Sequence, residues 1–123
     1  MPQHPIVHVE IPAADLVQAG DFYSQVFGWQ VEHIPQMGYT VFQAEGGPGG
    51  GFTKVDEQTA PVGRVLVYIH TDDIDGSLAR IEANGGVAVA PKTEIPGIGW
   101  FAVFTDPTGN RLALFTENRE AMR

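Results

Sequence analysis

VHVEIPAADLVQAGDFYSQVFGW, residues 7–29, is the stretch that decides the fold. At its start, apolar residues alternate with His8 and Glu10, which predicts a strand with one apolar face and one face carrying two ionisable side chains. Asp15 then suits the N-cap of a helix, apolar residues recur after it at helical spacing, and Gly28 suits a left-handed C-terminal cap. The stretch therefore predicts a strand, an amphipathic helix and the start of a second strand.

This pattern occurs twice in the chain. When the sequence is shifted against itself by about 58 residues, Asp15 falls on Asp73, Gly28 falls on Gly86, and the alternating strands align as well. A slightly larger offset of about 62 residues aligns the later strands of the two copies. The pattern therefore predicts two copies of one β-α-β-β-β unit.

The two units, called modules from here on, are predicted at about residues 6–55 and 64–117. A short polar stretch, DEQTAPVG at residues 56–63, links them. A chain of 123 residues can bury roughly two-thirds of the surface that it exposes when unfolded. The two modules are therefore predicted to form a single domain over residues 1–123.

The composition argues against several classes of protein. With no cysteine, the chain has neither a disulfide framework nor a catalytic thiol. A formal net charge of −8 at pH 7 argues against nucleic acid or an anionic membrane as a partner, because both require a basic patch. We find no apolar run long enough for a signal peptide or a membrane span, so the predicted location is the cytoplasm.

Four stretches carry a resemblance to a known family: IPAADL (11–16), FYSQVFGW (22–29), DDIDGSLARIEANGG (72–86) and FTDPTGNRLALF (104–115). In this order and spacing the chain resembles the vicinal oxygen chelate superfamily, which includes glyoxalases, extradiol dioxygenases and bleomycin-resistance proteins. The resemblance implies an α+β fold in which two paired βαβββ modules form a curved sheet around a cleft, with the helices outside. It also implies a homodimer, because small members commonly build or complete their clefts in that way.

Metal-dependent members of this superfamily take four ligands, usually His or Glu, from the first and fourth strands of each module. Carried over to this chain, the ligand positions fall on His8, Gly51, Leu66 and Ala113. Of these side chains only the imidazole can bind a metal. The glycine instead leaves room where its strand faces a cavity. The four-ligand metal site is therefore predicted to be absent, and no cofactor is expected.

His8 and Glu10 are the candidate catalytic residues. Histidine titrates near neutral pH, and a partly buried glutamate can have its pKa raised toward neutrality, so the two form a possible acid–base pair. Together with His70 they could instead hold a divalent metal at a displaced site. The structural alternative is that Glu10 accepts hydrogen bonds from a loop or from Arg111 while His8 packs.

Further residues are candidates for contact with a ligand. Tyr68 is the repeat counterpart of the first module's glutamate and could supply a phenolic hydrogen bond. Trp100 and Phe101, with Tyr39 as the counterpart of Phe101, could line a pocket for a planar or apolar molecule. The alternative for these aromatic residues is packing within the sheet. The predicted ligand-binding residues are Tyr39, Tyr68, Trp100, Phe101 and Arg111.

These patterns and the resemblance lead to three functional hypotheses. The first is a glyoxalase-like or bleomycin-resistance-like protein that binds a small organic molecule in a cleft without the four-ligand metal. The alternative is an enzyme of the lyase, isomerase, hydrolase or dioxygenase type that uses His8 and Glu10, with or without a relocated divalent metal. A partner-binding regulatory domain is the second alternative.

Overall fold

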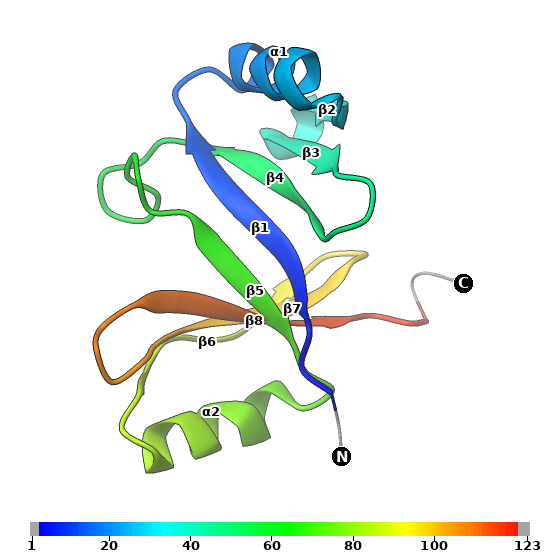
Figure 1. Ribbon diagram of the computed structural model, residues 1–123. Helices are drawn as coiled ribbons and strands as arrows, with labels where there is room; N and C mark the ends of the chain where they lie inside the picture. The colour runs from blue at the N-terminus through cyan, green and yellow to red at the C-terminus, as the bar shows by residue number, and fades with distance from the viewer. Residues whose placement is uncertain (1–2, 121–123) are drawn as a thin grey trace. The chain divides into compact units, whose positions relative to one another are not determined.

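The computed structural model describes residues 3–120, which form two compact units. One unit covers residues 7–67, and the other combines residues 68–120 with residues 3–6. Each unit contains one α-helix (Figure 1). Within the described part of the chain, neither helix is long and apolar enough to cross a membrane.

The first module contains four strands and the helix α1. Its elements are β1 (Ile6–Ala13), α1 (Leu16–Phe27), β2 (Gln30–Ile34), β3 (Tyr39–Gln43) and β4 (Gly49–Lys54), with a 3-10 turn, η1 (Pro35–Met37), between β2 and β3. Its strands lie in the order β2, β3, β4, β1. The β4 strand is antiparallel to β3 and parallel to β1, so it joins residues of β1 to residues of β3.

Both ends of α1 are capped as the sequence predicts. At the N-terminus the Asp15 carboxylate accepts the backbone N–H of Gln18 at 3.0 Å. At the C-terminus Gly28 adopts a φ of 73°, and its N–H donates to the carbonyl of Ser24. A left-handed φ is open to glycine without the steric cost that a Cβ brings, so this residue ends the helix.

The core of the first module lies between α1 and one face of the sheet. Phe42 and Phe52 are buried there, and Trp29 stacks on Phe42 with ring centroids 4.4 Å apart. Tyr23 of α1 stacks on Phe52 at 5.3 Å. Successive residues of a strand point to opposite faces, so the alternate residues of β1 lie on the face away from α1.

The second module repeats this arrangement. Its elements are β5 (Leu66–His70), α2 (Ile74–Ala83), β6 (Val87–Ile95), β7 (Gly99–Thr105) and β8 (Arg111–Glu117). The β8 strand is parallel to β5 and antiparallel to β7, which is antiparallel to β6. Pro5 lies beside the end of β5, because its carbonyl accepts the backbone N–H of His70 at 2.9 Å.

The core of the second module lies under α2. Ile74 and Leu78 of the helix pack with Phe104 and Leu114 in a buried cluster, and Trp100 packs against it. The Asp73 carboxylate caps the start of α2 by accepting the N–H of Gly76, as Asp15 does for α1. The two caps that the repeat aligns therefore have the same structural role.

The element order and pairing confirm the predicted α+β class and the two βαβββ modules. The internal repeat of the sequence predicted the two units, and the family resemblance implied the α+β class. The cleft that the resemblance implies stays a prediction, as does the number of domains.

Candidate functional site

Three polar side chains meet on the face of the first module's sheet that lies away from α1. The Nε2 atom of His8 lies 2.8 Å from the hydroxyl oxygen of Tyr39. The same hydroxyl donates to Oε2 of Glu10 at 3.1 Å. The rings of His8 and Tyr39 are nearly parallel, with an interplanar angle of 17°. These three residues are called the polar triad from here on.

The triad exists because residue 51 has no side chain. Gly51 lies on β4, between Glu10 of β1 and Val41 of β3 in the strand register. A Cβ built at Gly51 would collide with the ring and the hydroxyl of Tyr39. The tyrosine therefore crosses over β4 to reach β1, and the room that the sequence predicted beside this glycine is filled by Tyr39.

The positions of the protons on His8 and Tyr39 determine which atoms of the triad donate and which accept hydrogen bonds. A tyrosine hydroxyl has a single proton, so when Tyr39 donates to Glu10, the Nε2–H of His8 donates to the tyrosine oxygen. Burial lowers the pKa of His8 below its ordinary value of 6.5, because the charged imidazolium is poorly solvated there. His8 is therefore neutral at pH 7, and the triad offers both donors and acceptors.

The residues at the superfamily's ligand positions do not fit a four-ligand metal. The resemblance assigns these positions to His8, Gly51, Leu66 and Ala113, and only His8 carries a ligand atom. The space above Gly51 is filled by Tyr39, and Ala113 is fully buried. These four positions therefore cannot hold the metal.

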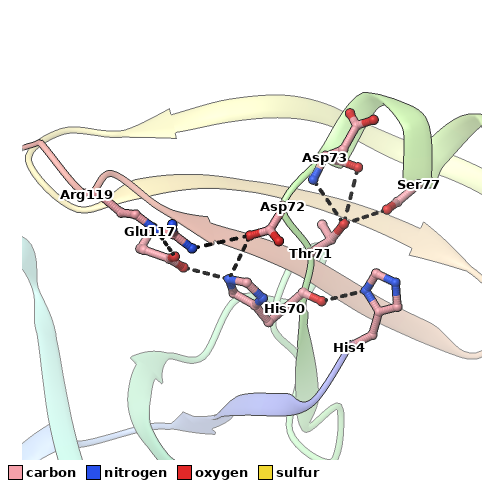
Figure 2. A network of polar contacts seen from close by, with 8 residues as sticks. All are labelled: His4, His70, Thr71, Asp72, Asp73, Ser77, Glu117 and Arg119. Carbon is pink, nitrogen blue, oxygen red and sulfur yellow. Dashed lines mark hydrogen bonds and ion pairs between the residues drawn. The ribbon is translucent and has the colours of Figure 1, made fainter. Parts of the chain in front are cut away.

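A second polar group lies in the second module, where β5 and β8 end (Figure 2). His70 Nε2 lies 2.7 Å from Oε2 of Glu117 and 3.9 Å from Oδ1 of Asp72. Arg119 contacts both carboxylates, at 3.0 Å from Glu117 and 3.6 Å from Asp72. His70, Asp72 and Glu117 are called the histidine–carboxylate cluster from here on, and their ligand atoms all lie within 4.8 Å of one another.

Hydrogen bonds hold the Glu117 carboxylate in its charged form. The pKa of Glu117 lies below its ordinary value, first because its own backbone N–H donates to the carboxylate and then because Arg119 and His70 donate to it, while partial burial opposes the shift. The Nδ1–H of His4 donates to the backbone carbonyl of His70 at 3.0 Å. The strand end that carries His70 is therefore tied down from two directions.

The remaining predicted ligand residues divide between the two faces of the second module's sheet. Tyr68 pairs with Ala113, and Phe101 pairs with Phe115, so both lie on the face away from α2. Trp100 lies on the opposite face and packs against the α2 core, with the Nζ of Lys92 5.1 Å from its ring centroid. This position favours packing for Trp100, the alternative that the sequence left open.

Arg111 opens β8 opposite Thr105 of β7, and it lies on the same face as Tyr68. The proposed contacts of Arg111, Tyr68 and Phe101 with a ligand stay predictions.

The structure brings together residues that the sequence did not link. The sequence singled out Tyr39 as a ligand contact, and it lies between His8 and Glu10. Asp72 and Glu117 were not among the candidates, although they lie beside His70. One signal was available: Glu117 follows Ala113 by as many residues as His70 follows Leu66, on strands that are parallel.

Comparisons with known proteins place this fold in a family. The profile of the glyoxalase/bleomycin resistance protein/dioxygenase superfamily matches residues 5–114. A glyoxylase-like domain-containing protein of Didymella fabae is 32% identical over 117 residues, which cover 88% of this chain and 90% of that protein. The anthracycline biosynthesis protein DnrV of Streptomyces peucetius is 28% identical over 86% of this chain, but this chain spans only 44% of its length.

Solved structures show the same fold at low sequence identity. Methylmalonyl-CoA epimerase from Mycobacterium tuberculosis matches with a TM-score of 0.72 and 15% identity, over 96% of this chain and 91% of that chain. A superfamily member from Vibrio splendidus 12B01 matches with a TM-score of 0.65 and 18% identity, over 92% of this chain and 98% of that chain. This chain belongs to the glyoxalase/bleomycin resistance protein/dioxygenase superfamily.

Proposed function

We propose that this chain binds a small organic molecule through its polar triad, without the four-ligand metal of the metal-dependent superfamily members. The observation that carries the proposal is the position of Tyr39 over Gly51. The Tyr39 hydroxyl group thus lies where a metal-binding side chain at position 51 would project. It connects the imidazole of His8 to the carboxylate of Glu10. Hydrogen bonding takes the part that metal coordination has in those members.

The triad suits a ligand that carries several oxygen atoms. Tyr39 and His8 can donate to a carbonyl or phenolate oxygen, and Glu10 can accept from a hydroxyl group. The relative from Streptomyces peucetius is named for anthracycline biosynthesis. Anthracyclines combine carbonyl and phenolic oxygens on one planar ring system, so an anthracycline is the first probe.

This proposal is tested by titrating the anthracycline with the protein and measuring the fluorescence of the anthracycline. Replacing Tyr39 by Phe removes one hydrogen bond and keeps the ring, so we expect affinity to fall by about three- to tenfold. The matched control is Tyr23→Phe, which changes a tyrosine of the α1 core in the same way and is expected to keep wild-type affinity. Saturable binding that Tyr39→Phe leaves unchanged would contradict a role for the triad.

If the anthracycline does not bind, a library of small carbonyl compounds and phenols follows, observed by two-dimensional protein NMR. The proposal requires that the amide signals shifted by a bound compound include those of His8, Glu10 and Gly51. Shifts confined to other parts of the chain would exclude the triad as the binding site.

An enzyme that moves a proton next to a carbonyl group is the second candidate function. The observation that favours it is the neutral state of His8 beside the Glu10 carboxylate, because either group can then accept a proton from carbon. The enolate oxygen that forms would accept a hydrogen bond from Tyr39, and return of the proton to carbon completes the cycle. This reaction class matches the epimerase among the proteins of similar fold.

Deuterium exchange separates the enzyme from the binding protein. The protein is incubated in D2O with methylmalonyl-CoA, and loss of the signal of the proton next to the carbonyl is followed by NMR. An enzyme should catalyse this exchange. If Glu10 is the base, Glu10→Gln should abolish the exchange while that variant still binds the substrate. Exchange at the uncatalysed rate with the wild-type protein would exclude this reaction for this substrate.

Two finer predictions rest on composition and resemblance alone. These are the cytoplasmic location and the third functional hypothesis, a partner-binding regulatory domain. A regulatory domain would form a defined complex with a protein partner and would bind none of the probes above.

A further inference from the structure

We propose that His70, Asp72 and Glu117 form a binding site for a single divalent transition-metal ion such as Zn2+, in the second module and apart from the superfamily's ligand positions. The three ligand atoms are one imidazole nitrogen and two carboxylate oxygens, and all lie within 4.8 Å of one another. Zn2+ takes this mixture of nitrogen and oxygen ligands, and three protein ligands leave a position open for water or substrate. The site does not depend on the polar triad.

The distances within the cluster are close to those that a metal needs. Two ligand atoms, each about 2.0–2.2 Å from a common tetrahedral ion, lie roughly 3.3 Å apart. His70 Nε2 is 2.7 Å from Glu117 Oε2 and 3.9 Å from Asp72 Oδ1, so one contact must lengthen and the other shorten by about 0.6 Å to meet that geometry. Side-chain rotation of the two carboxylates supplies such shifts without moving the strands.

The three proposed metal ligands differ in their exposure and in the element that carries them. His70 and Glu117 are the last residues of the neighbouring parallel strands β5 and β8, and their side chains are 19% and 23% exposed. Asp72 follows β5 by two residues and is 70% exposed. Two ligands therefore lie on the sheet, and the third lies on the segment between β5 and α2 (Figure 2).

The position of the cluster also relates it to the superfamily's metal chemistry. On β5 the histidine lies beyond Leu66 by the same number of residues that Glu117 lies beyond Ala113 on β8. Leu66 and Ala113 are the second module's ligand positions by resemblance, and neither can bind a metal. His70 and Glu117 thus have the same separation in the sequence as Leu66 and Ala113, and both lie at the ends of their strands.

Arg119 supplies a positive charge to both carboxylates of the cluster. Its guanidinium contacts Glu117 at 3.0 Å and Asp72 at 3.6 Å, and its side chain is 71% exposed. An exposed arginine loses little when its ion pairs break, because water solvates the freed guanidinium. A divalent ion can therefore displace Arg119, and the arginine should weaken binding by competition.

Competition between the protein and a chromogenic zinc chelator, with protein free of a polyhistidine tag, measures the affinity and the stoichiometry. We expect one Zn2+ per chain for the wild type, and affinity lower by roughly tenfold or more for His70→Gln and for Glu117→Gln. Arg119→Gln should bind about two- to fivefold more tightly, because the competing cation is gone. Mg2+ should not compete, because it prefers all-oxygen ligands.

Two controls locate the site. Glu82→Gln removes a carboxylate from α2 in the same module and should leave zinc affinity unchanged. His8→Gln tests the first module and should also leave it unchanged. Circular dichroism shows whether each variant keeps its fold. Zinc binding that His8→Gln abolishes and His70→Gln preserves would overturn the proposal, as would a wild type that binds no more tightly than Glu117→Gln.

Discussion

At the residue scale, the chemistry of the first module depends on one hydroxyl proton. Tyr39 contacts His8 and Glu10 at once, and a single proton can be donated to only one of them. When Tyr39 donates this proton to the Glu10 carboxylate, His8 is the donor in the hydrogen bond between His8 and Tyr39. A neutral imidazole keeps its Nε2–H proton, so the two hydrogen bonds run in one direction, from His8 through Tyr39 to Glu10.

The burial of His8 predicts how stability depends on pH. The pKa of His8 is lower in the folded protein than its ordinary value of 6.5, so below about pH 6.5 the unfolded chain binds more protons than the folded chain. The free energy of unfolding should therefore fall as pH decreases from about 7 to 5. Urea denaturation across this range measures it, and His8→Gln should show a smaller decrease. Equal pH dependence in the two proteins would contradict the depressed pKa.

At the element scale, the middle strand β4 determines whether side chains of β3 and β1 can contact each other across it. A side chain at the position of Gly51 would separate β3 from β1 on this face, because its Cβ would collide with the Tyr39 ring. The glycine serves here through its small size, which is a role often found where another group approaches the backbone closely. The same strand supplies Phe52 to the core on its other face.

Gly51→Ala tests this dependence. We expect a loss of about 1–3 kcal/mol in the free energy of unfolding, because an added methyl group overpacks a filled space. The double variant Gly51→Ala with Tyr39→Ala removes the collision, so the two changes should be strongly non-additive in denaturant unfolding. Gly47→Ala is the matched control, with open space around its Cβ, and should change stability by less than about 0.5 kcal/mol. Strict additivity would show that Tyr39 does not fill this space.

At the scale of the whole molecule, the assembly predicted from the resemblance is a homodimer. Light scattering coupled to size-exclusion chromatography should give about twice the chain mass of 13.3 kDa over a tenfold concentration range. Exposed apolar side chains of α1, among them Phe22 and Phe27, offer surface for such contacts. A mass equal to one chain at every concentration would contradict the homodimer.

The α+β class of the paired modules followed from the family resemblance. The sequence by itself determined the duplicated β-α-β-β-β unit, the N-caps of both helices, the glycine cap of α1 and the faces of the strands. Each of these follows from local periodicity or from a residue with a strong backbone preference, such as Asp15 or Gly28. It also determined that Gly51 cannot ligate a metal, because that follows from residue type alone. These properties are visible within a few residues of chain or in the repeat.

Only the tertiary structure decided which polar groups meet. Tyr39 reaches His8 and Glu10 because β4 lies between β3 and β1 and is bare at one position. Glu117 reaches His70 because β8 pairs in parallel with β5. Both contacts join residues far apart in the sequence, and strand register between distant segments is set by the packing of the whole module and not by any local pattern.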